Sequence, residues 1–193
     1  MFFRKAAIRK IPAWAIVDEF AIERAEISLN ADSPALQDRL DRLFRAFGNE
    51  QPALSSYLSE EIGELGHELT QSLGYFLIAA IFRVFTEAFP ERLDEVDEAA
   101  LSIAIETLAA DEALRANDPL EILESDDLVA MNQPSLVDYV QGHLRDAFDQ
   151  AEDDVPIEEL DRVYRAALVE IIALSHAVVS PEGVSGPPSE LLH

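Results

Sequence analysis

The stretch Asn49-Glu50-Gln51-Pro52-Ala53-Leu54-Ser55-Ser56-Tyr57-Leu58 recurs as Asn132-Gln133-Pro134-Ser135-Leu136-Val137-Asp138-Tyr139-Val140. Both copies contain the pattern Gln-Pro-x-Leu-x-x-Tyr. Proline fixes φ and is favoured at the first position of a helix, and residues three apart share a helix face. Each copy therefore predicts a turn, a helix that begins at the proline, and a buried leucine and tyrosine. The repeated structural residues are Gln51, Pro52, Leu54, Tyr57, Gln133, Pro134, Leu136 and Tyr139.

Two further pairs of landmarks recur in the same order. Residues 17–22 resemble residues 96–101, at a spacing of 79 (96 − 17), and Ser33-Pro34 corresponds to Asp118-Pro119, at a spacing of 85 (119 − 34). The two prolines of the repeated pattern are 82 positions apart (134 − 52). Conserved order with slightly drifting spacing is typical of a tandem duplication.

Apolar residues follow helical spacing nearly everywhere, and no segment alternates with period two for long. The sequence therefore predicts an all-α fold, a helical bundle or short α-solenoid built from two tandem, similar four-helix units. We expect a basic N-terminal segment at 1–11, unit 1 at 12–90, unit 2 at 91–179 packed with unit 1 as one globular body, and a flexible tail at 180–193. The long apolar helices at 73–89 and 160–179 should join the units.

The boundary of one helix pair stays open in the sequence. Residues 53–89 can form one long helix or two, and Ser59 followed by Glu60-Glu61 favours a break near position 58 with Ser59 as the helix cap. The Asn and Gln of the repeated pattern are predicted to hydrogen-bond backbone groups at their own turn.

Charge restricts the partners of the chain. Asp plus Glu number 38 and Lys plus Arg 14, which gives a formal net charge of −24. Such a charge disfavours nucleic acid and anionic membranes and favours a basic protein partner. Cysteine is absent, which excludes disulfides and thiol chemistry. The apolar run at 73–82 is too short to span a bilayer, so we expect no transmembrane segment and a cytoplasmic protein.

The N-terminal segment is the exception to this acidity. Arg4, Lys5, Arg9 and Lys10 alternate with apolar residues. We expect residues 1–11 to pack on the acidic body or on a second subunit, and peripheral membrane contact is the alternative. The sequence does not determine the oligomeric state.

The best candidate for chemistry is the pair Glu64 and His67, at the i, i+3 spacing that ligates metals in di-metal helical bundles. The duplicated half lacks a matching pair, so neither a metal nor another cofactor is expected. The sequence predicts a non-enzymatic protein-interaction or regulatory module with an acidic surface. The alternatives are an antitoxin-like or immunity-like inhibitor of a basic partner and, less favoured, a metal-binding helical-bundle enzyme that uses Glu64 and His67.

Overall fold

The computed structural model describes residues 10–29, 35–117, 128–151 and 155–181, and in this part every regular element is helical. The all-α prediction is confirmed. An isolated β-bridge joins Leu93 and Val178. The elements are a 3₁₀ helix, η1 (Ala13–Ala15), and the helices α1 (Glu19–Leu29), α2 (Ala35–Glu50), α3 (Pro52–Gly63), α4 (Glu68–Ala88), α5 (Glu98–Asn117), α6 (Leu128–Asn132), α7 (Pro134–Gln150) and α8 (Ile157–Ala177).

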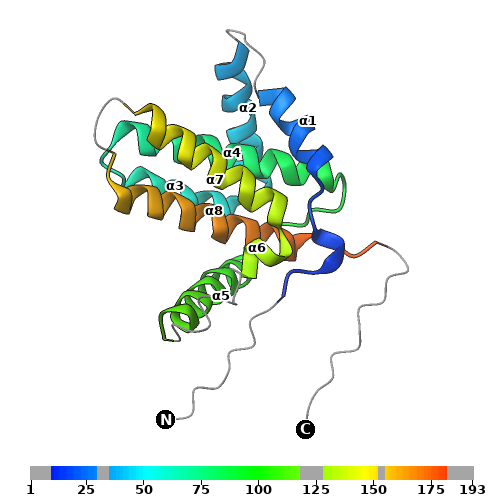
Figure 1. Ribbon diagram of the computed structural model, residues 1–193. Coiled ribbons are helices and arrows are strands. Elements are labelled where there is room, and N and C mark those ends of the chain that lie inside the picture. Colours follow the sequence, from blue (N-terminus) through cyan, green and yellow to red (C-terminus); the bar gives the residue numbers. More distant parts are fainter. Residues whose placement is uncertain (1–9, 30–34, 118–127, 152–154, 182–193) are drawn as a thin grey trace.

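The centre of the molecule is the pair α4 and α8, which pack against each other (Figure 1). Each helix has 21 residues, and each is buried around most of its circumference over two to three turns. A helix that is apolar on all sides requires neighbours on all sides. The long apolar helices therefore join the two halves of the chain, as the sequence predicts.

The remaining helices cover this central pair in a regular way. α1 packs on α4, and α5 packs on α8. α3 and α7 each contact both central helices, and α2 covers another face of α4. The core between α2 and α4 includes Phe47 and Phe82, whose ring centroids are 4.8 Å apart.

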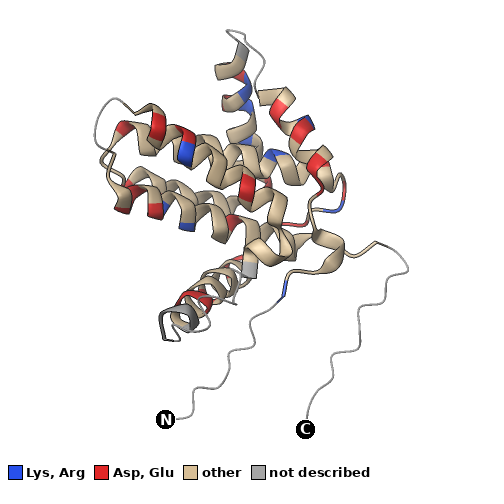
Figure 2. Cartoon of the chain, in the orientation of Figure 1, with Lys and Arg blue, Asp and Glu red and all other residues tan. Residues whose placement is uncertain are grey.

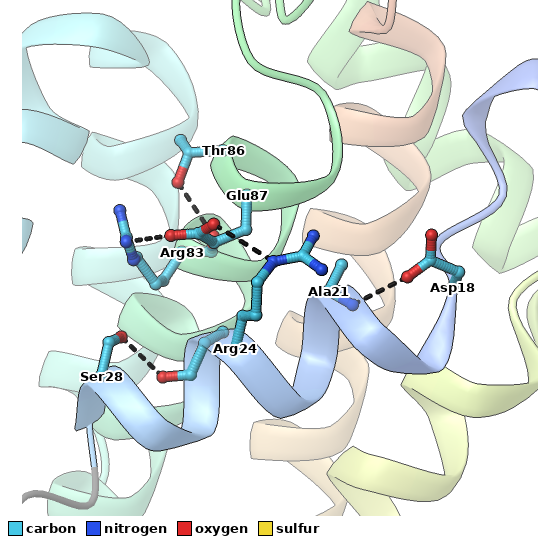
Figure 3. A network of polar contacts seen from close by, with 8 residues as sticks. Asp18, Ala21, Arg24, Ser28, Arg83, Thr86 and Glu87 are labelled. Atoms are coloured by element: carbon cyan, nitrogen blue, oxygen red, sulfur yellow. Dashed lines mark hydrogen bonds and ion pairs between the residues drawn. The ribbon is translucent and has the colours of Figure 1, made fainter.

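Polar contacts hold α1 on α4 (Figure 3). Asp18 caps α1 by accepting a hydrogen bond from the backbone N–H of Ala21 at 2.7 Å. From the same helix, Arg24 reaches Glu87 of α4 at 3.6 Å, and Arg83 pairs with the same carboxylate. The Arg24–Glu87 pair thus joins the polar edge of α1 to α4.

The break between α3 and α4 differs from the expectation. It lies at residues 64–67, and His67 is the N-cap of α4, whereas Ser59 lies inside α3. The physical reason is distant in sequence. The Glu159 carboxylate, in the first turn of α8, accepts hydrogen bonds from the backbone N–H groups of Gly66 at 3.0 Å and His67 at 3.1 Å. An anion at a helix N-terminus is favourable, so α8 stabilises the start of α4.

Some expectations lie outside the described residues. These are the landmarks Ser33-Pro34 and Asp118-Pro119, residues 1–9 of the N-terminal segment and residues 182–193 of the tail.

By length and composition alone, α4 resembles a membrane-spanning helix, and among the described residues it is the one helix that does. More than half of its most apolar window is buried inside the protein, at 56%. The core helices of soluble proteins have the same properties.

Gly74 gives a direct test of the α3–α4 packing. A Cβ at Gly74 would lie 2.7 Å from Cδ1 and 2.9 Å from Cγ2 of the fully buried Ile62. We expect Gly74→Ala to lower the free energy of unfolding by about 1 to 3 kcal/mol, because Ile62 has no space to move into. Urea denaturation measures this change.

Gly142 is the matched control, because it lies in helix α7 and a Cβ there would meet nothing within 4 Å. Gly142→Ala should raise the free energy of unfolding by up to about 1 kcal/mol through helix propensity. If both substitutions stabilise the protein equally, the close contact between α3 and α4 is wrong.

Candidate functional site

Gln51 connects the start of α3 to the segment before α5. Its side chain is 1% exposed. Nε2 donates to the carbonyl oxygen of Asp94 at 2.9 Å, and Oε1 accepts from the N–H of Val96 at 2.7 Å. The sequence predicts instead a hydrogen bond at the glutamine's own turn. The actual partners are 43 and 45 residues away.

Gln133 does the same for the segment before α1. It is also 1% exposed. Its Nε2 donates to the carbonyl oxygen of Ala15 at 2.6 Å, and its Oε1 accepts from the N–H of Val17 at 2.9 Å. Nε2 also donates to Oγ of Ser175 in α8, at 3.0 Å. Each glutamine thus holds the segment that leads into the first helix of the opposite half.

The neighbours of the two glutamines also match. Pro52 and Pro134 are the first residues of α3 and α7, and Leu54 and Leu136 are 0% exposed. Val17 and Val96, whose N–H groups bind the glutamines, are each followed by an aspartate that caps the next helix. Like Asp18, Asp97 accepts from a backbone N–H, that of Ala100, at 2.7 Å.

We predict similar losses of stability when either glutamine is truncated. Gln51→Ala and Gln133→Ala each leave a backbone donor and a backbone acceptor without their side-chain partner, and a buried unsatisfied polar group costs about 1 to 3 kcal/mol. Each substitution should lower the free energy of unfolding by about 2 to 4 kcal/mol, measured from urea midpoints. A loss below about 0.5 kcal/mol at either site would show that water replaces the side chain there.

The repeated tyrosines, which the sequence predicts to be buried, are only half-buried in the structure. They lie on helices that pack against the long helix of the other half. Tyr57 in α3 interacts with Arg165 of α8, and burial is the main cause of its raised pKa, with a contribution from Glu61. Tyr139 in α7 meets the ring of His143 edge-on, with centroids 4.6 Å apart. Burial raises the pKa of Tyr139, and Glu26 raises it further.

Glu64 and His67 have different partners from each other. The Glu64 carboxylate accepts a hydrogen bond from Arg162 of α8 at 3.0 Å. Nδ1 of His67 accepts from the N–H of Leu69 as the cap of α4, at 3.3 Å. Hydrogen bonds from Thr70 and from the Gly66 and His67 N–H groups lower the pKa of Glu159. These contacts hold the start of α8 against the α3–α4 turn.

In the described part of the chain, no group of three or more His, Asp or Glu residues is arranged to hold a metal ion.

An open groove of about 680 Å³ runs between α2 and α4. Half-buried apolar side chains form one part of its lining, and exposed polar side chains form the rest. The rings of Phe44 and Tyr75 meet edge-to-face at 5.9 Å. The lining consists of Gln37, Leu40, Asp41, Phe44, Arg45, Ser72, Tyr75 and Phe76.

One ring of the groove continues into the contact with α7. Phe76 meets His143 edge-on with centroids 5.1 Å apart. Burial lowers the pKa of His143, and the nearby carboxylates Glu26 and Asp146 oppose this shift. The groove is thus joined to a row of aromatic and imidazole rings that links α2, α4 and α7. Its volume is within the range of ligand and peptide sites.

Sequence reasoning missed this groove. Phe44 and Phe76 follow the apolar spacing of their helices, which predicts the buried face but does not show that the edge of that face stays open. Neither residue is fully buried in the structure. The available signal was the cluster of aromatic residues at 75–76 beside the polar Gln71-Ser72.

Glu170 is a further residue that sequence reasoning did not single out. This residue is 0% exposed in the middle of α8, and both carboxyl oxygens are buried without a hydrogen-bond partner. Burial raises its pKa well above the usual value. The signal in the sequence was one acid inside the apolar stretch 166–174. An unpaired buried charge is costly, so burial favours the neutral, protonated form of this side chain.

Glu170 should make stability depend on pH. A carboxyl whose pKa is raised by folding keeps its proton after the unfolded chain has lost it. The free energy of unfolding therefore falls as pH rises from the unfolded pKa toward the folded one, by up to about 1.4 kcal/mol per pH unit. We expect Glu170→Leu to remove this slope and to raise stability at pH 8, measured by urea denaturation from pH 5 to 8.

The exposed Glu106 supplies a control for the same measurement. Glu106→Gln should keep the slope of the unchanged protein. If Glu170→Leu keeps the same slope as well, the buried carboxyl is not the titrating group.

Comparison with known proteins gives no relative for this site. No protein-family model, no curated protein and no solved structure matches the chain.

Proposed function

We propose that the chain is a non-enzymatic protein-interaction module that recognises a basic partner protein, and that it is built from two similar helical units at 12–90 and 91–179. The groove between α2 and α4 is the observation that carries this proposal. Its described lining holds one carboxylate, one guanidinium and no imidazole, a set without the paired groups of acid–base or nucleophilic catalysis. A concave surface with half-buried aromatic rings is suited to docking another chain.

Charge supports a basic partner. With 38 acidic and 14 basic residues, the chain cannot neutralise its own carboxylates. Figure 2 shows acidic residues along α1, α7 and α8. Ion pairs such as Arg162 with Glu64 and Arg165 with Glu112 engage a few of them. The remaining field attracts a basic protein and repels nucleic acid and anionic lipid.

The paired contacts support the two-unit architecture. Gln51 and Gln133 hold equivalent segments. The backbone angles of the two glutamines are nearly the same, φ −134° and ψ 60° for Gln51 against φ −132° and ψ 55° for Gln133. Asp18 and Asp97 cap the following helices at the same distance. The last helix of each half has 21 residues. Two copies of one ancestral unit, each completed by the other, account for these matches.

We place the module in the cytoplasm.

The proposal is tested by isolating the partner and measuring its salt dependence. The tagged full chain is used as bait in a lysate of the native organism, and retained proteins are identified by mass spectrometry. The purified pair is then titrated by calorimetry. We expect a partner of high isoelectric point whose affinity falls at least about tenfold between 0.05 and 0.5 M NaCl, because salt screens the attraction between the two surfaces.

Two results would contradict the proposal. One is the absence of any retained protein beyond those held by an unrelated bait of equal charge. The other is a partner whose affinity is unchanged by salt, because binding would then not use the acidic surface.

A further inference from the structure

A second, smaller cavity lies between α5 and α8, and it shares one feature with the groove, a tyrosine in its lining. Its volume is about 280 Å³, and Tyr164 lines it as Tyr75 lines the groove. Both tyrosines occupy the same position in their 21-residue helices, seven residues after the first (75 − 68 and 164 − 157). The two cavities therefore offer a comparison within one chain.

The residue that follows each tyrosine differs. In α8 it is Arg165, whose guanidinium donates two hydrogen bonds to the Glu112 carboxylate, at 2.7 and 3.0 Å. These hydrogen bonds are the main cause of the raised pKa of Arg165. The cavity on α8 thus contains an arginine from the chain itself, bound by a carboxylate beside a tyrosine.

In α4 the corresponding residue is Phe76. The arginine that lines the groove is Arg45 of α2, and its printed hydrogen bond goes to a main-chain oxygen and not to a carboxylate. The other parts of the arrangement are present. Tyr75, Phe44 and Phe76 supply aromatic rings, and Asp41 supplies an exposed carboxylate. The Asp41 side chain accepts a hydrogen bond from the neutral Gln37 at 3.1 Å, and Arg45 donates through Nε to the main-chain oxygen of Asp41 at 3.0 Å. The groove therefore has an acceptor and ring faces for a guanidinium.

We propose that the groove binds an arginine side chain presented by an amphipathic segment of the partner. This inference rests on the proposed function and names the residue type that the partner inserts. The guanidinium pairs with Asp41 and stacks on the aromatic rings, and flanking apolar side chains pack against Leu40 and Phe44. Arginine fits better than lysine, because its planar group both stacks and forms two parallel hydrogen bonds.

The net charge argues against a second copy as the occupant. Two chains of −24 repel each other, whereas an arginine-bearing segment is attracted.

The experiment uses a synthetic probe, a 15-residue amphipathic helix with leucine on one face and arginine on both flanks. It is titrated into the isotopically labelled full chain and followed by amide chemical shifts. We expect the largest shifts at residues of α2 and α4 around Ser72 and Phe44. The same peptide with lysine in place of arginine should bind several-fold more weakly. Shifts confined to another face, or no shifts, would overturn the assignment of the groove.

Charge reversal provides matched variants. Asp41→Lys should lower the affinity for the arginine peptide by about tenfold or more, because it replaces the hydrogen-bond acceptor with a positive charge that repels arginine. Glu106→Lys makes the same change in charge at an exposed site on α5 and should alter the affinity by less than about twofold. Equal losses in both variants would mean general attraction to an acidic protein, which contradicts a specific arginine site. Amide spectra of the free variants confirm that both are folded.

A steric variant distinguishes the remaining occupants. Ser72→Trp fills the groove from its exposed α4 side and should also abolish peptide binding. If groove resonances of the free chain move with protein concentration and Ser72→Trp stops this, a second copy occupies the groove. If deletion of residues 1–9 moves them, the chain's own N-terminus does. Either result overturns the proposal.

The native partner separates this inference from the proposed function. If the isolated partner binds in a salt-dependent manner but is unaffected by Asp41→Lys and Ser72→Trp, the groove assignment is wrong and the module function stands. If no partner is isolated while the peptide still binds in the groove, the proposed function fails by its own test.

Discussion

Buried backbone groups require hydrogen-bond partners, and this requirement connects the two halves of the molecule. Residues 16–18 and 94–97, which lead into α1 and α5, lie outside any helix, so they have no regular helical hydrogen bonds of their own. A glutamine side chain carries one amide, with a donor and an acceptor, and can satisfy both groups at once. Gln51 and Gln133 do this across the molecule. Each half therefore supplies hydrogen-bond partners for the entry segment of the other.

The proline after each glutamine makes this arrangement reproducible. Pro52 and Pro134 begin α3 and α7, and restrict the backbone of the residue before them. The glutamine side chains therefore leave the chain in nearly the same direction in both halves. Buried Leu54 and Leu136 then anchor the first turn. A short local pattern thus sets a long-range contact.

The sequence predicts the helices well because helical periodicity is local. It predicts neither the partners of the glutamines nor the position of the break before α4. Ser59 has the local chemistry of a cap, but Glu159, about 90 residues away, stabilises a start at His67 instead. Glu64 and His67 have the spacing of a metal-ligand pair in the sequence. In the structure Arg162 hydrogen-bonds to Glu64, and His67 caps helix α4. Contacts between distant segments decide each of these cases.

The groove and the buried carboxyl show a second limit of sequence reasoning. Helical spacing assigns Phe44 and Phe76 to a packed face, but the depth of burial depends on how closely α2 and α7 approach α4. Glu170 is visible as one acid within an apolar stretch, yet its lack of a partner is a property of the packed core. The net charge is the basis of the proposed basic partner, and it gives no location for the contact.

The differences between the halves are more informative about function than their similarities. Residues shared by both halves, such as the glutamines and the capping aspartates, perform the same structural task twice, so the fold explains them. The paired helices differ in chemistry at several aligned positions. Two of these differences concern the cavities and the buried carboxyl: Phe76 corresponds to Arg165, and Ile81 corresponds to Glu170, which both lie 13 residues after the start of their helix (81 − 68 and 170 − 157). The fold accepts either residue type at each position. In the proposed duplication, the open groove beside Phe76 is therefore not a requirement of the architecture, and the proposed arginine site gives it a role that the fold alone does not supply.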